Sequence, residues 1–486
     1  MNRKTGKWDI VVLGGGTAGI VASKTAAGLG ARVMLIEREK TGGDCLWTGC
    51  VPSKSILAAA HAASIALTSA NLGVTFSEPS INFLAVMNHV KSVIKSIAPQ
   101  DSVTSLEEFG VTVIHGNALF TSPNSISVNG SDISFRKAII ATGASPSVPA
   151  IPGLAESTYL TSDNIWELKE LPEKLVVLGA GSIGSELGQA FSRLGSQVTL
   201  IDGASRILPR EDEDASKILY HRLNAEGVSI ITSAKVKGIN TDTNGRGEII
   251  FDSPSELDCA VEFDRILISI GRSPRTSGLS LEKAQVELDD RKFVITSASL
   301  RTTNPNIWAA GDMTGHPQFT HVAGVHGSTA ASNAILGISR KAELLIPRVT
   351  FTDPEIAAVG EVTHSTTTSW KVLQRSNADV DRAIAESQQS GLTKIVIDSK
   401  GRIVGGLSVG PRAGEVLAEI TLAIRMGLKT RDIASTIHPY PTYGDGFWNL
   451  AVADVRDQLS SPGLKFVLNS LRRLSKLKDL TLSRKN

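Results

Sequence analysis

Residues 8–19 read WDIVVLGGGTAG, an apolar run that ends in a glycine-rich turn. The apolar part predicts a buried parallel strand, and the residues after the turn predict a helix. Gly14 allows the tight turn, Gly16 lets the backbone approach a pyrophosphate, and Gly19 permits close packing of the helix on the strand. A second strand, residues 32–36, is followed by Glu37, an acid suited to bind a ribose hydroxyl. The glycines alone fit an ordinary turn, but the whole unit predicts a dinucleotide-binding fold.

The same pattern occurs again at residues 174–184, which read KLVVLGAGSIG. Two such units in one chain predict that two dinucleotides bind at once. Asp202 follows the next strand and favours a free 2′-hydroxyl, hence NADH, whereas Arg206 is placed to meet the 2′-phosphate of NADPH. The sequence is therefore compatible with either NADH or NADPH as the nicotinamide cofactor. The second fingerprint is formed by Gly179, Gly181 and Gly184.

Residues 41–54 read TGGDCLWTGCVPSK, with two cysteines separated by four residues. Pro52 predicts the first position of a helix that continues to about residue 67. Cys50 then lies at the helix N-terminus, where partial positive charge and free N–H groups favour a thiolate, and Lys54 adds a cation one turn on. A thiolate beside a second thiol, Cys45, can carry out reversible disulfide chemistry. A structural disulfide or half of a zinc site are the alternatives for the pair on its own.

The composition is that of a multidomain globular protein. The length of 486 residues predicts about three domains, and a hydrophobic content of 41% allows a large core. A net charge of +2 argues against a nucleic-acid partner. We find no secretory signal and no apolar run long enough to span a bilayer, and only three cysteines occur, so we expect a cytoplasmic protein. The third cysteine, Cys259, has no assigned role.

The sequence pattern changes after residue 347, where alternating predicted strands and helices indicate an α+β domain without a glycine fingerprint. A late stretch, residues 437–445, reads IHPYPTYGD and is rich in titratable groups. Its candidates for chemistry are His438, Tyr440 and Asp445.

Residues 461–486 carry seven Lys or Arg and one acid. Two alternatives follow for this basic amphipathic tail. Its apolar stripe packs on the preceding domain, or residues 464–486 make peripheral contact with an anionic membrane. The stripe consists of Phe466, Leu468, Leu471, Leu474 and Leu477.

Taken in order, these motifs resemble the class I pyridine nucleotide-disulfide oxidoreductases, which include lipoamide dehydrogenase, glutathione reductase and mercuric reductase. The resemblance covers about residues 8–455. It implies an α/β protein with two Rossmann-like dinucleotide-binding domains, for FAD and NAD(P), and a C-terminal α+β dimerisation domain. It also implies a homodimer in which the C-terminal domain of one chain completes the active site of the other. The implied domains are FAD-binding at 1–155 and 276–345, NAD(P)-binding at 156–275, dimerisation at 346–460, and the tail at 461–486.

The family pattern also implies roles for single residues. Cys45 would be the interchange thiol that faces the substrate, and Cys50 the charge-transfer thiol against the flavin. Lys54 and Glu186 would form an ion pair near the reactive nitrogen of the flavin. The residues implied for NADH or NADPH are Gly179, Gly181, Gly184, Asp202, Arg206 and Gly271. Those implied for FAD are Gly14, Gly16, Gly19, Glu37, Gly43, Thr48, Thr142, Gly143, Gly311 and Asp312.

The sequence departs from the family where disulfide-reducing members carry a His-Pro pair and a Glu five residues after the His. The matching positions are Tyr440, Pro441 and Asp445. Tyrosine is a poor base near neutral pH because its ordinary pKa is about 10. His438 lies two residues earlier and is the alternative base. A tyrosine here is similar to mercuric reductase, although the vicinal C-terminal cysteines and the N-terminal Cys-x-x-Cys domain of well-equipped mercuric reductases are missing.

We therefore expect an enzyme that passes electrons from NAD(P)H through FAD to the Cys45–Cys50 disulfide and on to a small acceptor. A soft metal ion such as Hg(II) or Cu(II) is the expected substrate, held transiently by the two thiolates. The alternative enzyme is a dihydrolipoamide dehydrogenase-type disulfide reductase or diaphorase. The alternative of another class is a flavoprotein of low turnover that senses redox state or sequesters metal.

Overall fold

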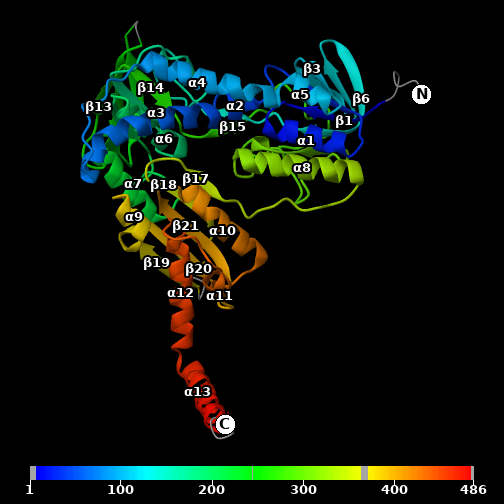
Figure 1. The fold of residues 1–486 in the computed structure, drawn as a ribbon. Helices are drawn as coiled ribbons and strands as arrows, with labels where there is room; N and C mark the ends of the chain where they lie inside the picture. The colour runs from blue at the N-terminus through cyan, green and yellow to red at the C-terminus, as the bar shows by residue number, and fades with distance from the viewer. Residues whose placement is uncertain (1–6, 243–244, 363–369, 483–486) are drawn as a thin grey trace. The chain divides into compact units, whose positions relative to one another are not determined.

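The computed structural model describes residues 7–242, 245–362 and 370–482, of which 477–482 are described by their backbone alone. The chain divides into two compact units (Figure 1). The first contains residues up to Arg210 and Tyr220–Ile346, and the second contains Glu211–Leu219 and the residues from Pro347 on. Each unit is described by itself.

The first unit contains a sheet built around β1 (Trp8–Leu13), which pairs in parallel with β2 (Val33–Glu37) and β6 (Ser131–Ile140). Both faces of β1 are buried, since Ile10 and Val12 belong to one apolar cluster and Val11 and Leu13 to another. This explains the uninterrupted apolar run in the sequence. The strand order is β3-β2-β1-β6-β5-β4, with β16 also paired to β6. The remaining strands are β3 (Val111–His115), β4 (Ala118–Ser122), β5 (Ser125–Val128) and β16 (Ile307–Ala309).

Helices α1 (Thr17–Gly28) and α8 (Thr320–Leu336) lie side by side on one face of this sheet (Figure 1). Their small residues bring the two backbones close, and a Cβ atom at Gly327 would lie 2.3 Å from the carbonyl oxygen of Ala18. The other helices of this part of the chain are α2 (Gly43–Trp47), α3 (Cys50–Thr68), α4 (Phe83–Ile97) and α5 (Val103–Glu108).

A second parallel sheet has the order β10-β9-β8-β14. The glycine fingerprint lies between β8 and α6, as it lies between β1 and α1 in the first sheet. The two sheets confirm the predicted α/β class with two Rossmann-like halves. The elements are β8 (Lys174–Leu178), α6 (Ser182–Arg193), β9 (Gln197–Ile201), β10 (Ser229–Ile231) and β14 (Arg265–Ile268). The first unit also contains the meander β11 (Lys235–Thr241), β12 (Gly247–Asp252) and β13 (Cys259–Phe263) and the ribbon β7 (Ala144–Pro146) with β15 (Arg272–Pro274). Helix α7 (Glu213–Ala225) is divided between the two units after Leu219.

The second unit is an antiparallel five-stranded sheet in the order β17-β18-β21-β20-β19. Helices α10 and α12 pack on this sheet. It is the α+β domain that the sequence predicts after residue 347. Its elements are β17 (Arg348–Thr350), β18 (Glu355–Gly360), β19 (Lys371–Ser376), α9 (Asp381–Ala385), β20 (Leu392–Ile397), β21 (Ile403–Gly410), α10 (Ala413–Met426), α11 (Thr430–Ser435), α12 (Asp445–Leu459) and α13 (Pro462–Leu482).

One helical stretch in the described chain, Gly43–Leu72, is long and apolar enough to cross a membrane by length and composition alone. The glycines and Lys54 interrupt the apolar run of this stretch, so the sequence alone does not indicate it. One third of its most apolar window is buried in the structure, and core helices pass the same test.

The tail forms α13, but its apolar stripe does not pack on the preceding domain of the same chain. Side chains from Ser461 to Lys476 are exposed, except for the half-buried Ser470. The first alternative for the tail is therefore wrong over these residues. The side chain of Leu477, which the stripe also includes, lies outside the described residues.

Candidate active site

The first glycine fingerprint forms a tight cradle at the start of α1. Gly14 has φ 100°, and a Cβ atom there would lie 2.4 Å from the carbonyl oxygen of Ala141, so only glycine fits without strain. Gly16 is the N-cap of α1, and a Cβ on Gly19 would lie 1.8 Å from the carbonyl oxygen of Gly14. The free N–H groups of this helix end suit a pyrophosphate.

Glu37 lies at the end of β2 beside this cradle. One of its carboxylate oxygens accepts a hydrogen bond from the Gly15 N–H at 2.5 Å, and the other accepts from the Glu39 N–H at 2.7 Å. These two bonds fix the acid at the edge of the cradle, where the sequence predicts a ribose contact.

The second fingerprint repeats this construction. Asp202 accepts hydrogen bonds from the N–H groups of Ala180 at 2.6 Å and of Ala204 at 2.7 Å. Gly181 is the N-cap of α6, and a Cβ on Gly184 would lie 1.9 Å from the carbonyl oxygen of Gly179. The two halves thus present equivalent sites, as two dinucleotides require.

The side chain of Arg206 folds back onto the loop that contains it, residues 206–209. Its guanidinium donates to the carbonyl oxygens of Leu208 at 3.1 Å and Pro209 at 3.0 Å. Asp202 is therefore the group that we expect at the ribose position, where its carboxylate would repel a 2′-phosphate.

We expect kcat/KM to be at least about tenfold higher for NADH than for NADPH, because the Asp202 carboxylate accepts ribose hydroxyls and repels phosphate. Asp202→Ser should narrow this preference, and Arg206→Ala should change it little. Steady-state rates with both nicotinamides check this. A clear preference for NADPH that Arg206→Ala removes would show that Arg206 decides the choice.

The two cysteines lie in residues 41–50, here called the thiol loop, a segment that contains the short helix α2 and is fixed at both ends. α2 begins next to Gly42, and a Cβ at Gly43 would lie 2.6 Å from Gly16 Cα, which brings the loop against the first cradle. The indole N–H of Trp47 donates to the Thr41 carbonyl oxygen at 2.8 Å. The indole N–H of Trp166 donates to the Thr48 carbonyl oxygen at 3.0 Å.

Helix α3 begins at Cys50, with Gly49 as its N-cap. The helix starts two residues before Pro52, the predicted first position, and proline is tolerated in this first turn because N–H groups there lack helical partners. Cys50 therefore lies at the helix N-terminus, as predicted.

The two thiols differ in acidity. A hydrogen bond from Cys45, one with the Thr320 hydroxyl and the charge of Lys54 lower the pKa of Cys50 to about 6. The Cys50 Sγ lies 3.1 Å from Thr320 Oγ1. The bond to Cys50 and burial raise the pKa of Cys45 well above its ordinary value. At neutral pH the reduced pair thus consists of a Cys50 thiolate and a Cys45 thiol, and both cysteines are free in this structure.

Lys54 and Glu186 form the ion pair that the family pattern implies. The Lys54 Nζ lies 2.8 Å from Glu186 Oε2, and the Glu186 side chain is only 8% exposed. The pair joins α3 to α6, which carries the second fingerprint. It therefore places a cation near Cys50 and connects the thiol helix to the nicotinamide-binding half.

Removing the Thr320 hydroxyl should raise the pKa of Cys50, because the thiolate then loses a hydrogen-bond donor. In the reduced protein the thiolate-to-flavin absorption should be present above about pH 6 and fade below it. With Thr320→Val the midpoint of this titration should move up by about one unit, whereas Thr320→Ser should leave it in place. An unchanged midpoint in Thr320→Val would contradict this role.

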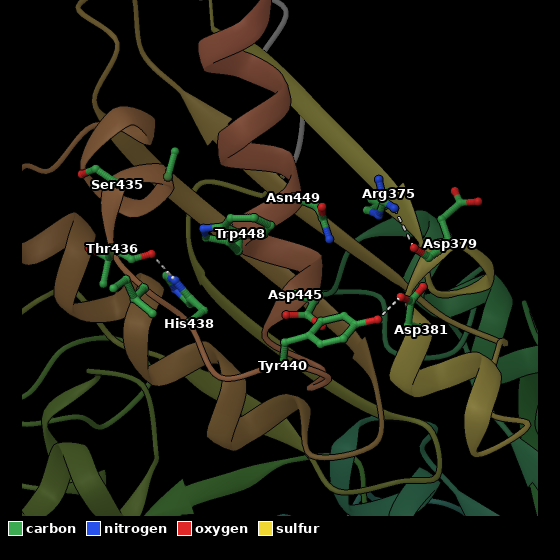
Figure 2. Close-up of a pocket in the computed structure, with 12 residues that line it drawn as sticks. Arg375, Asp379, Asp381, Ser435, Thr436, His438, Tyr440, Asp445, Trp448 and Asn449 are labelled. Atoms are coloured by element: carbon green, nitrogen blue, oxygen red, sulfur yellow. Dashed lines mark hydrogen bonds between the residues drawn. The ribbon is translucent and has the colours of Figure 1, made fainter.

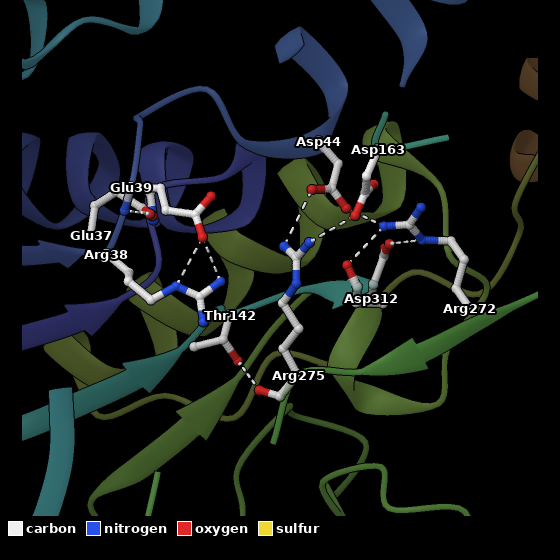
Figure 3. A network of polar contacts seen from close by, with 11 residues as sticks. Glu37, Arg38, Glu39, Asp44, Thr142, Asp163, Arg272, Arg275 and Asp312 are labelled. Atoms are coloured by element: carbon white, nitrogen blue, oxygen red, sulfur yellow. Dashed lines mark hydrogen bonds and ion pairs between the residues drawn. The ribbon is translucent and has the colours of Figure 1, made fainter. Parts of the chain in front are cut away.

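A network of charged side chains lies beside the cradle and the thiol loop (Figure 3). Arg272 contacts Asp44, the residue before Cys45, and its Nε lies 3.6 Å from Asp312 Oδ2. Arg275 Nη1 lies 3.3 Å from Asp44 Oδ1, and Arg275 Nη2 lies 3.8 Å from Asp163 Oδ2. Burial raises the pKa of Asp312.

This network fits a polar ligand. Arg272 Nε and Asp163 Oδ1 are buried without hydrogen-bond partners within the described chain, so Arg272 Nε can donate to a hydroxyl or phosphate oxygen and Asp163 Oδ1 can accept from a hydroxyl group. Together with the cradle at Gly14 and Gly43, these atoms fit FAD.

The other predicted cofactor residues lie in the same unit. The Thr142 hydroxyl donates to the Arg275 carbonyl oxygen at 2.8 Å, and the Gly143 carbonyl oxygen accepts from the Arg275 N–H at 2.9 Å. Gly311 precedes Asp312 after β16, and Gly271 precedes β15. Five residues of the site were not indicated by the sequence motifs: Asp44, Asp163, Arg272, Arg275 and Thr320. The arginine-containing turn after β14, residues 271–275, is the signal that could have indicated the two arginines.

The three candidates of the second unit line one cavity of about 530 Å³ (Figure 2). The Tyr440 hydroxyl donates to Asp381 Oδ2 at 2.6 Å. This bond raises the pKa of Tyr440 above its ordinary value. Asp445 instead accepts from the Thr442 N–H at 3.1 Å. Tyr440 and Asp445 are therefore not hydrogen-bonded to each other as a base and its orienting acid would be.

His438, in the same cavity, has partners on both ring nitrogens. Nε2 lies 2.8 Å from Glu419 Oε1, and Nδ1 lies 2.9 Å from the Thr436 carbonyl oxygen. Although burial opposes it, the Thr436 carbonyl and the Glu419 carboxylate raise the pKa of His438. No group of three or more His, Cys, Asp or Glu side chains in the described ranges is arranged to hold a metal ion.

Comparisons with known proteins agree with this construction. The family model of pyridine nucleotide-disulphide oxidoreductases matches residues 8–327, and the model of their dimerisation domain matches residues 346–451. A mercuric reductase of Bacillus cereus is 34% identical over 453 residues, which cover 90% of this chain and 70% of the relative. A dihydrolipoyl dehydrogenase of Vibrio parahaemolyticus is 35% identical over 454 residues, 90% of this chain and 93% of the relative.

Solved structures with the same fold include the Cu(II) complex of the HOCl-induced flavoprotein disulfide reductase RclA from Escherichia coli. It has a TM-score of 0.82 and 27% identity, and the match covers 92% of this chain and 100% of RclA. LpdA from Mycobacterium tuberculosis has a TM-score of 0.83 and 28% identity, with 91% of this chain and 99% of LpdA covered.

The dimerisation domain indicates a homodimer. The family uses FAD and NAD(P)H, for which the two halves of the first unit provide the fingerprints. The chain therefore belongs to the class I pyridine nucleotide-disulfide oxidoreductases and is an FAD-containing oxidoreductase.

Proposed function

We propose that this oxidoreductase reduces a small soft-metal ion, Cu(II) or Hg(II), with electrons from NADH. Metal ions of this kind prefer thiolate ligands, and Cys45 and Cys50 provide two. FAD, when bound, accepts a hydride and passes electrons in pairs to the thiol pair. Two electrons reduce one Hg(II) to Hg(0) or two Cu(II) to Cu(I), and the two thiols become a disulfide.

The residues of the chain set the proton balance of this reaction. Cys50 is already a thiolate at neutral pH because hydrogen bonds from Cys45 and Thr320 and the charge of Lys54 lower its pKa. Cys45 is a thiol, so it loses a proton when it binds a metal ion, and its contact with Cys50 opposes that loss until a cation arrives. A cationic acceptor is thus favoured over a neutral one, because it supplies the charge that releases the proton.

The observation that carries the proposal is the hydrogen bond from Tyr440 to Asp381. A disulfide reductase needs a base that takes and returns the proton of the interchange thiol. Tyr440 stands at the family position of that base, but Asp381 keeps its hydroxyl protonated. A metal acceptor leaves no sulfur to be protonated, and so it does not need the base.

The acidic lining of the cavity further supports a cation. Three acids line it, against the two basic residues Arg375 and His438. The acids are Asp379, Asp381 and Asp445. Mercuric reductases and the Cu(II) complex of RclA among the relatives support the same class of acceptor.

A disulfide acceptor of the dihydrolipoamide type is the second candidate, and the His438–Glu419 contact favours it. A histidine held 2.8 Å from a carboxylate has the arrangement of a base and its orienting acid.

The test compares purified flavoprotein with NADH and five acceptors: Cu(II), Hg(II), lipoamide, glutathione disulfide and a quinone. The proposal expects turnover with a metal ion to exceed turnover with either disulfide, and His438→Gln to leave metal turnover in place. Faster lipoamide turnover that His438→Gln abolishes would establish the second candidate. If NADH neither bleaches the flavin nor produces the thiolate-to-flavin absorption, the protein is a low-turnover binding or sensing flavoprotein.

A further inference from the structure

Helix α13 (Pro462–Leu482) has one apolar face whose described part is exposed. Leu464 is 38% exposed, and Leu471 and Leu474 are each 57% exposed. At 100° per residue, the members of this face fall within about 120° of arc. They are Leu464, Val467, Leu468, Leu471 and Leu474. Phe466, which the sequence analysis placed in the stripe, falls outside this arc.

The opposite face of α13 is basic. Four cations fall within about 100° of arc, and no acid occurs between residues 461 and 476. All four side chains are exposed. They are Lys465, Arg472, Arg473 and Lys476. A helix with an apolar face and an opposite face that carries only positive charges is the form that lies in the surface of an anionic bilayer.

Two observations favour a membrane over a second copy of the chain. The dimerisation model ends at residue 451, before α13 begins, so this helix is an addition to the domain that pairs two chains. An apolar face of about 120° is wider than the narrow seam of a two-stranded coiled coil and suits a flat surface.

We propose that α13 docks the protein on an anionic membrane surface. The leucine face enters the boundary between headgroups and acyl chains, and the long Lys and Arg side chains reach back to the phosphates. The anionic lipid contributes attraction at each basic residue, which salt weakens.

The experiment is co-sedimentation of the full-length flavoprotein with vesicles of phosphatidylcholine alone or with about 30% phosphatidylglycerol. We expect binding to the anionic vesicles only, and at least about a tenfold weaker partition in about 0.5 M than in about 0.05 M NaCl. Glutamate at Lys465, Arg472, Arg473 and Lys476 should abolish binding, and so should serine at Leu468 and Leu471.

Two matched controls distinguish docking through α13 from effects of net charge and from nonspecific hydrophobic binding. Glutamate at the exposed lysines 91, 95, 169 and 283 makes the same change in net charge outside α13. Serine at Leu257 and Leu344, which are 70% and 69% exposed, removes two exposed leucines elsewhere. Both controls should bind like the parent protein.

Three outcomes would overturn the proposal. The first is that the parent sediments with neither vesicle, and the second is that the α13 variants bind as well as the controls. The third is that Leu468→Ser with Leu471→Ser changes the sedimentation coefficient of the lipid-free protein, which would mean that a second copy covers the face. Flavin content, measured for every variant, shows that the fold is retained.

Discussion

Serine in place of Cys45 or Cys50 is expected to stop electron transfer to metal ions and disulfides while FAD stays bound. The cradle at Gly14 and the network around Arg272 do not use either sulfur, so the flavin site is unchanged. Turnover with Cu(II), Hg(II) or lipoamide should fall by at least about 10³-fold, because no oxygen analogue of the disulfide can form. Stopped-flow absorbance should still show that NADH reduces the flavin.

The two variants should differ in colour. With Cys45→Ser the disulfide cannot form, so the Cys50 thiolate remains next to the flavin and its long-wavelength absorption should appear in the oxidised protein. With Cys50→Ser it should be missing. Cys259 is the matched control, since its Sγ lies in β13 at 3.5 Å from the Glu256 carbonyl oxygen, away from the loop. Cys259→Ser should behave like the parent. Loss of FAD from both loop variants would instead mean that the pair is structural.

The second large effect is expected at Gly179, the first glycine of the nicotinamide half. Gly179 has φ 106°, and a Cβ atom there would lie 2.6 Å from the Ser269 carbonyl oxygen. Gly179→Ala must therefore shift the turn that positions the cofactor. A displacement of about 1 Å at a reacting centre costs on the order of 10²-fold in rate, so reduction by NADH should fall by at least that factor.

In Gly179→Ala, the rate of flavin reduction by NADH must be compared with flavin reduction by a chemical reductant that does not use the nicotinamide site. Dithionite should still reduce the flavin and the thiols, because the FAD half is intact. Gly28→Ala is the matched control, since a Cβ at Gly28 meets nothing within 4 Å. Normal reduction by NADH in Gly179→Ala, or equal losses with dithionite and NADH, would contradict the assignment of this half.

The sequence predicted the fold well because its signals are local. A buried strand, a glycine turn and a helix are contiguous in both halves, and steric limits at Gly14 and Gly179 leave little choice of backbone. The position of Cys50 at a helix N-terminus was predictable for the same reason. The family pattern paired Lys54 with Glu186, although 132 residues separate them.

The missed residues are those that meet only in the folded chain. Thr320 is 270 residues from Cys50, and Arg272 is 228 residues from Asp44. No local periodicity connects such positions, and threonine or arginine alone in a turn has many ordinary roles. The Tyr440–Asp381 bond was also missed as a pairing because Asp381 lies on a separate helix, α9.

The hydrogen bonds that the indole groups of Trp47 and Trp166 donate to the thiol loop have a consequence for the speed of electron transfer. Trp47 holds the carbonyl of Thr41, and Trp166 holds that of Thr48, so the backbone on both sides of Cys45 is fixed by hydrogen bonds. Opening and closing the disulfide then requires rotation of the two sulfur atoms and little movement of the chain. The reorganisation energy of the thiol pair should be small, and amide hydrogen exchange across residues 41–50 should be the same in the oxidised and the reduced protein.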